Sequence, residues 1–167
     1  MKLILFRHGL AVEHDDYIKT NQDDSLRPLV LKGKRRTMTM AKHLQSRIGS
    51  VDMIVSSPYV RAKQTAEILK RVLQPKKYFE CVELIPSAPP MAFASWLRAN
   101  AALATKIIVV GHAPQLNTFA SWSLSGQLEN FIDIKKSGML GLEIENFQNY
   151  VSGQAELKFL LSYSLLI

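Results

Sequence analysis

The sequence predicts an α/β fold built on a largely parallel β-sheet. Short apolar runs typical of buried strands alternate with longer segments whose apolar residues recur at helical spacing. Glycine or proline punctuates several of these segments and separates them into distinct elements. Strands and helices that alternate along a chain form layered sheets, and ligand sites then gather at the carboxyl ends of the strands.

The first strand is predicted at residues 2–6, an apolar run that ends in a turn at Gly9. Residues 10–30 are polar and irregular, and they are predicted to form a long loop. The spacing of apolar residues predicts a helix over residues 34–48, and Gly49 ends it.

A second buried strand is predicted at residues 51–55. A helix follows, with Ser57 as its N-cap and Pro58 as its first residue, and it ends near Pro75. A short third strand is predicted at residues 80–85. The later elements expected are a helix at 89–103, a strand at 106–110, a helix at 114–124 and two strands, paired late in the chain and antiparallel, at 140–147 and 156–162.

The composition fits one globular domain spanning residues 1–167. Hydrophobic residues make up 47% of the chain and charged residues 21%, a balance that excludes general disorder. The single cysteine, Cys81, cannot form an internal disulfide and suits a reducing compartment. The apolar start is too short for a signal peptide, and no apolar stretch could span a bilayer. We therefore expect a cytoplasmic protein without a membrane segment.

The net charge of +7 is compatible with nucleic acid, an acidic partner protein or small anionic substrates. The densest basic cluster is Lys32, Lys34, Arg35 and Arg36. No aromatic residues are interleaved with these charges, and the cluster matches no nucleic-acid-binding motif. We expect no nucleic-acid binding, and we interpret most of these charges as solvated surface. One hypothesis is that the cluster flanks a pocket and attracts an acidic partner.

Two histidines follow directly after predicted buried strands. His8 comes after the first strand, and His112 comes after the strand at 106–110. Each histidine adjoins a glycine, which allows close approach of the backbone to a ligand. If the two strands are parallel neighbours, both imidazoles lie at the same edge of the sheet.

Arg61 lies in the first turn of a predicted helix that follows another strand end. Helix N-termini carry free N–H groups and partial positive charge, and a guanidinium fork matches phosphate oxygens. The simpler alternative is a surface arginine that pairs with Glu67 or another acid. His8 and His112 lack partners at the spacing of a zinc site, so no metal is expected.

These features resemble the histidine phosphatase (phosphoglycerate-mutase-like) superfamily. The marks are Arg-His-Gly at residues 7–9, Ser-Pro-x-x-Arg-Ala-x-Gln-Thr-Ala at residues 57–66, and a late Gly-His at residues 111–112. Arg-Pro-Leu at residues 27–29 and the short length are closer still to its SixA-type phosphohistidine phosphatases. The resemblance covers residues 1 to about 125 and implies a three-layer α/β/α fold whose mostly parallel sheet has an antiparallel edge strand.

The resemblance implies that His8 attacks phosphorus in line and forms a phosphohistidine that water then hydrolyses, without a metal or cofactor. Arg7, Arg61 and His112 would bind the three peripheral oxygens. The two arginines would also disfavour the imidazolium form of His8 by like-charge repulsion. A backbone carbonyl after Gly9 is expected to accept a hydrogen bond from the other ring nitrogen.

Two further residues are candidates on the same grounds. Arg27 matches the SixA-type segment, where an arginine reaches the phosphate pocket or its rim; alternatively, it only orders residues 20–30. Glu83 occupies the segment in which many members carry a general acid, and Ala113 stands where acid phosphatases carry another. The aspartate pairs at 15–16 and 23–24 are interpreted as loop charges.

The resemblance points to removal of phosphate from phosphohistidine in a protein such as a phosphotransfer domain, because a phosphoramidate needs less help from an acid than an ester does. A small-molecule phosphatase, acting on sugar phosphates or nucleotides, is the first alternative. A non-catalytic phosphate- or phosphoprotein-binding module is the second. The oligomeric state does not follow from the sequence.

Overall fold

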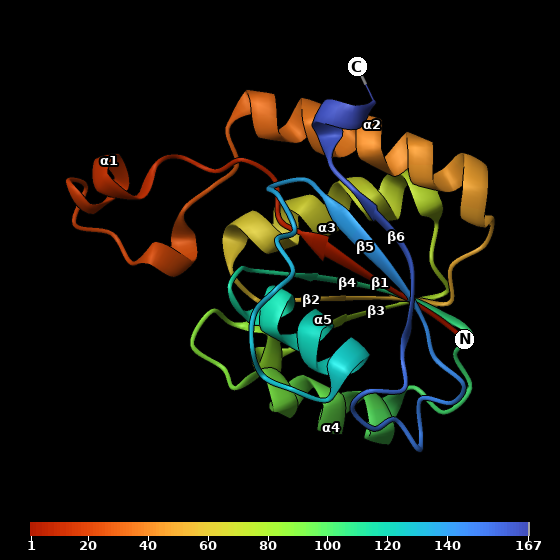
Figure 1. Cartoon of the computed structure of the whole chain (residues 1–167). Helices are drawn as coiled ribbons and strands as arrows, with labels where there is room; N and C mark the ends of the chain where they lie inside the picture. The colour runs from red at the N-terminus through yellow and green to blue at the C-terminus, as the bar shows by residue number, and fades with distance from the viewer. Residues whose placement is uncertain (167) are drawn as a thin grey trace.

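The computed structural model describes residues 1–166 and shows a six-stranded sheet with helices on both faces (Figure 1). The strand order is β3-β2-β4-β1-β5-β6. The strands are β1 Lys2–Arg7, β2 Met53–Ser56, β3 Lys77–Glu80, β4 Lys106–Gly111, β5 Met139–Glu143 and β6 Glu156–Leu161.

The sheet is mostly parallel, as predicted. β1 pairs with β4, β4 with β2, and β2 with β3, all in parallel. β5 pairs antiparallel with both β1 and β6, so the late antiparallel pair is confirmed. The reversed strand, β5, lies one place inside the edge, and β6 is the outermost strand on that side.

Two helices cover each face of the sheet, which gives the predicted three layers (Figure 1). α2 (Leu31–Ile48) and α3 (Val60–Leu73) pack against one set of strand side chains, which includes Ile4 and Phe6. α4 (Pro90–Asn100) and α5 (Gln115–Ser125) pack against the alternate set, which includes Leu3 and Leu5. Successive strand residues point to opposite faces, and helices cover both faces. The short central strands are therefore apolar throughout. Within residues 1–166, no helix is long and apolar enough to cross a membrane.

Residues 12–28 form an arm that projects beyond the carboxyl ends of the strands (Figure 1). The predicted loop carries two short helical turns, α1 (His14–Ile18) and the 3₁₀ turn η1 (Asp24–Leu26). The arm is closed at its base, where Ala11 and Leu29 form an antiparallel bridge. The arm is therefore tied at both ends to the body of the protein.

Several element boundaries differ from the sequence predictions. β5 ends at Glu143 rather than at residue 147, and α4 ends at Asn100 rather than near residue 103. The third strand is β3, and the predicted strand at 80–85 is wrong, because residues 82–84 form the 3₁₀ turn η2 (Val82–Leu84). β3 is an edge strand with mostly exposed side chains, so it lacks the apolar run that marks a buried strand. α3 begins at Val60 rather than Pro58, and α2 begins three residues earlier than predicted. A last 3₁₀ turn, η3 (Tyr163–Leu165), follows β6.

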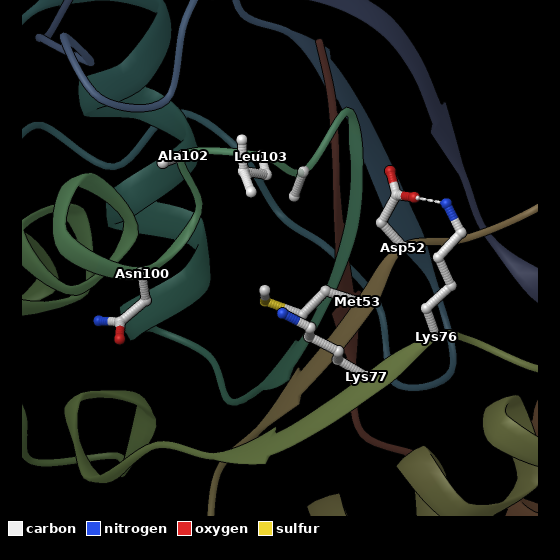
Figure 2. A pocket seen from close by; sticks show the side chains of 8 residues that line it. Asp52, Met53, Lys76, Lys77, Asn100, Ala102 and Leu103 are labelled. Carbon is white, nitrogen blue, oxygen red and sulfur yellow. Dashed lines mark hydrogen bonds and ion pairs between the residues drawn. The ribbon is translucent and has the colours of Figure 1, made fainter.

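Asp52 fastens the amino-terminal ends of the strands. It lines a hollow of about 330 Å³ between the starts of β2 and β3 and the end of α4, shown in Figure 2. Its carboxylate accepts hydrogen bonds from Lys76 Nζ at 2.7 Å, Thr105 N at 2.9 Å and Lys106 N at 3.1 Å. These bonds lower the pKa of Asp52 well below its ordinary value, and the bond from Lys76 has the largest effect.

We expect Asp52→Ala to lower the free energy of unfolding by about 1 kcal/mol, because the backbone N–H groups of Thr105 and Lys106 lose a charged acceptor. A lowered pKa stabilises the fold above the ordinary aspartate pKa of 3.8, and this contribution is lost as the pH falls below it. Urea unfolding at neutral and at acid pH would test this, and the two proteins should converge in acid. Asp16→Ala, which breaks an exposed pair with Lys19, is the control and should cost no more than about 0.5 kcal/mol.

Candidate active site

The carboxyl ends of three neighbouring strands bring His8, His112 and Ser57 together. Arg7 and Gly111 are paired residues of β1 and β4, so the next residue of each strand is a histidine at the same edge. The ring centroids of His8 and His112 lie 5.0 Å apart. Only 6% of His8 and 2% of His112 is exposed. The predicted convergence of the two imidazoles is therefore present in the fold.

The His8 ring is held in one neutral tautomer. Its Nδ1 lies 2.7 Å from the carbonyl oxygen of Gly9, which can only accept, so Nδ1 carries the hydrogen and Nε2 keeps its lone pair. Burial, and after it the positive charges of Arg61 and Arg7, lower the pKa of His8 to about 3. The ring is therefore a neutral base with Nε2 available for attack at neutral pH.

The backbone after His8 is fixed by contacts with α2 and α3. Gly9 N donates to Thr65 Oγ1 at 3.0 Å, and the same hydroxyl donates to the carbonyl oxygen of Arg61 at 2.8 Å. Gly33 of α2 packs so closely that a Cβ there would lie 2.1 Å from the carbonyl oxygen of Leu10. The helix therefore needs glycine at this position to touch the chain two residues after His8.

Ser57 orients the second imidazole. His112 Nε2 lies 2.9 Å from Ser57 Oγ, and the serine is fully buried. Burial, and after it the neighbouring His8, lower the pKa of His112. Ser57 is not the helix cap that the sequence predicts, because α3 begins at Val60, and the serine is part of the site. Its place directly after β2, at the same sheet edge as both histidines, was the signal that could have found it.

Two guanidinium groups flank the imidazoles. Arg7 donates to the carbonyl oxygen of Ile134 at 2.9 Å, and Arg61 donates to the carbonyl oxygen of Asp24 at 2.8 Å. Burial lowers the pKa of both arginines, although each keeps a carboxylate nearby. Arg7 Nε, Arg61 Nε and His112 Nδ1 are buried without a partner among residues 1–166. Buried donors without acceptors are costly, so an anion in this pocket is their natural partner.

Asp24 joins the arm to the site, and its interpretation as a loop charge is wrong. Its carboxylate accepts from Arg61 NH2 at 3.0 Å and from Arg27 Nε at 2.8 Å, and it lies 3.2 Å from His14 Nδ1. Partial burial opposes ionisation, but the bond from Arg27 and the two positive charges prevail and lower the pKa of Asp24. Sequence reasoning missed this role because Asp24 and Arg61 lie 37 residues apart.

Arg27 is connected to the histidines and arginines of the site through Asp24, whereas Glu83 is not bonded to them within residues 1–166. Arg27 bonds Asp24 and also donates to the carbonyl oxygen of Val12 at 2.7 Å, so it both orders the arm and adds charge beside Arg61. Glu83 accepts from Cys81 Sγ at 3.1 Å, and it makes no hydrogen bond or ion pair with the histidines or arginines of the site among the described residues. The Arg61–Glu67 pair considered from sequence does not form, because Glu67 pairs with Lys70 and Arg71.

Taken together, the site offers one buried nucleophilic nitrogen beside a second imidazole and two guanidinium groups. Such a set can bind a tetrahedral oxyanion and attack its central atom. Among residues 1–166, no group of three or more histidine, cysteine, aspartate or glutamate side chains is arranged to hold a metal ion.

The chain is similar in sequence to proteins of one superfamily. Residues 3–83 match the model of the histidine phosphatase superfamily (branch 1). An uncharacterized protein of Picosynechococcus is 39% identical over 145 residues, which cover 85% of this chain and 84% of the relative. The phosphohistidine phosphatase SixA of Escherichia coli is 28% identical over 117 residues, covering 68% of each chain.

A solved structure shares the whole architecture. The protein histidine phosphatase SixA complexed with tungstate superposes with a TM-score of 0.85 over 100% of both chains, at 22% identity. That likeness shows that the two chains share one fold, from the first strand through the late antiparallel pair.

Proposed function

Because this chain belongs to the histidine phosphatase superfamily, we propose that it is a phosphatase that forms a phosphorylated His8 intermediate and acts on phosphohistidine in proteins. One observation carries the proposal: His8 is a neutral imidazole whose Nδ1 is held by Gly9, and its ring lies 5.0 Å from that of His112. Two arginines flank the rings, and the Nε of each is buried without a partner among residues 1–166. This is the arrangement that in-line attack on a phosphoryl group requires.

In the proposed reaction, the lone pair of His8 Nε2 forms a bond to phosphorus while the bond from phosphorus to the substrate nitrogen breaks. The substrate imidazole, which carries a hydrogen on its other ring nitrogen, takes that electron pair and leaves as a neutral ring. Water then attacks the phosphorus, the bond to Nε2 breaks, and inorganic phosphate leaves. Arg7, Arg61 and His112 hold the three peripheral oxygens and stabilise the charge that spreads over them in the transition state.

The substrate class is supported by the surroundings of Glu83. A phosphate ester releases an alkoxide and benefits from a general acid, whereas a phosphoramidate releases a better leaving group. Glu83 is bonded to Cys81 rather than to the cluster, so the carboxyl proposed as the acid is engaged elsewhere. We also propose a cytoplasmic location, in keeping with the free buried thiol of Cys81.

A substrate panel assayed without added metal tests the proposal. We expect hydrolysis of a histidine-phosphorylated protein and little turnover of sugar phosphates or nucleotides. The reverse preference would make the chain a small-molecule phosphatase. If no substrate of the panel is hydrolysed but vanadate binds tightly, the chain is a non-catalytic phosphate-binding module.

The protonation of His8 gives a second test. Its pKa of about 3, compared with the ordinary 6.5, keeps the ring neutral well into acid. The C2 proton resonance of His8, assigned by its disappearance in His8→Ala, should hold its position from about pH 8 to about pH 5. A titration midpoint near the ordinary value would contradict the account of a desolvated nucleophile.

Asp24→Asn should weaken turnover by about tenfold, because a neutral amide no longer aligns two guanidinium groups. The variant should show a raised KM as well as a lowered kcat, since Arg61 contacts the phosphoryl group in the bound substrate as well as in the transition state. Asp23→Asn is the matched control, because Asp23 lies next in the chain and only caps η1. If Asp24→Asn instead binds vanadate more tightly and turns over faster, Asp24 competes with phosphate rather than positioning its ligands.

A further inference from the structure

A basic hollow of about 500 Å³ lies beside Arg7. It is formed by α2, by the turn before β5 and by η3, and its lining residues are Arg7, Arg36, Lys135, Lys136, Ser162, Tyr163 and Ser164. We propose that this hollow binds carboxylates that flank the phosphohistidine of a protein substrate. This inference rests on the proposed function and names the feature that selects its substrate.

The hollow adjoins the catalytic pocket through a shared side chain. Arg7 directly precedes His8 and is one of the residues that line the hollow, and its NH1 is anchored on the carbonyl oxygen of Ile134. A group bound in the hollow is therefore next to the phosphoryl group on His8. A substrate that fills both places must carry a phosphohistidine with an anionic neighbour.

The charges of the hollow are incompletely balanced by the protein itself. Lys135 pairs with Asp133, and Lys136 Nζ lies 3.9 Å from a carboxylate oxygen of Glu13. Arg36 lies 4.8 Å from the centroid of the Tyr163 ring and makes no ion pair among residues 1–166. Four cationic side chains thus face two carboxylates, which leaves positive charge in excess.

The existing ion pairs can be exchanged for those of a partner. The side chains of Lys135 and Asp133 are 68% and 57% exposed, and that of Glu13 is 71% exposed. Exposed pairs of this kind contribute little to stability, so incoming carboxylates can replace them at small cost. Arg36 keeps its planar fork free for a bidentate contact.

The arrangement suits separate carboxylates better than a second phosphate. Phosphate sites in proteins converge backbone N–H groups and bidentate arginines on one point. Here the positive groups come from the end of β1, from α2 and from the turn at 135–136. Two of them are lysines, which act as point charges on flexible stems. Such groups match acidic side chains spread over a protein surface, which also gain from electrostatic steering.

The test uses two histidine-phosphorylated peptides that differ only in their flanking residues, glutamate in one and glutamine in the other. We expect Arg36→Glu combined with Lys136→Glu to lower kcat/KM for the glutamate peptide by about tenfold and to leave the glutamine peptide within about twofold. Lys42→Glu combined with Arg47→Glu, on the same helix, changes the net charge equally and is the control. It should leave the preference for the glutamate peptide intact.

Equal losses for both peptides, an equal effect of the control, or no effect at all would each overturn the proposal. Loss of turnover confined to a bisphosphorylated sugar would assign the hollow to a second phosphate instead. Binding of both peptides to His8→Ala, measured by fluorescence anisotropy, separates this inference from the proposed function. Preferential binding without turnover by the wild-type protein would refute the function alone, whereas turnover without preferential binding would refute the hollow alone.

Discussion

His8→Ala is expected to abolish phosphoryl transfer, lowering kcat by at least about ten-thousandfold. The variant removes the only atom that the mechanism uses to form a bond to phosphorus. Arg7, Arg61 and His112 can still bind the phosphoryl group, but alanine offers no nitrogen to accept it. A rapid acid-free quench with a ³²P-labelled substrate should trap base-stable, acid-labile label on the wild-type protein and none on the variant. His43→Ala, on α2, is the control and should retain full labelling.

The His8 experiment can fail in an informative way. Label that persists in His8→Ala would move the nucleophile to another nitrogen, and His112 would then be the nearest imidazole. Its Nε2 faces Ser57 Oγ, so its Nδ1 would have to attack. A His112→Ala variant that lost the label while His8→Ala kept it would overturn the proposed roles of the two histidines.

Arg61→Gln is expected to lower kcat/KM by about a hundredfold to a thousandfold. The buried guanidinium supplies charge and donors where the peripheral oxygens develop negative charge, and an amide supplies neither the charge nor the fork. Arg61→Lys should recover little of this loss, because an ammonium cannot bind Asp24 and an oxyanion along two directions at once. Steady-state kinetics on a histidine-phosphorylated protein would measure both variants.

Arg71→Gln provides the matched control for Arg61. Arg71 lies on the same helix, but its side chain is 72% exposed and pairs only with Glu67. We expect wild-type kinetics from it. An equal loss in both variants would trace the effect to the helix as a whole, and a normal rate in Arg61→Gln would remove the arginine from the catalytic set. Melting temperatures of both variants would show whether the fold is intact.

The parts of the site that the sequence predicted are those fixed by local structure. His8 and His112 each follow a strand directly, so once the strands are recognised as parallel neighbours their convergence follows. Arg61 was found for a similar reason, since its place in the first turn of α3 depends only on the neighbouring residues. The largely parallel sheet followed from the alternation of apolar runs and amphipathic segments, whereas the three layers were implied by the family resemblance.

The parts that the sequence did not predict depend on long-range packing. The role of Asp24 requires the path of the whole arm, because nothing near Asp24 in the chain marks it as a partner of Arg61. Gly33 preceded the helix predicted at residues 34–48, and only the fold shows that it belongs to α2 and that Leu10 passes over it. β3 was misplaced because an edge strand with exposed side chains carries no periodic signal.

The closed base of the arm has a consequence for how such a protein can diversify. Val30 N bonds the carbonyl oxygen of Leu10 at 3.0 Å, and Leu29 bridges Ala11, so both ends of the arm are clamped where Leu10 presses on Gly33. Residues beyond this neck can be lengthened, shortened or exchanged without displacing His8, provided that a carboxylate still reaches Arg61. Recognition and chemistry can therefore evolve as separate modules on one scaffold.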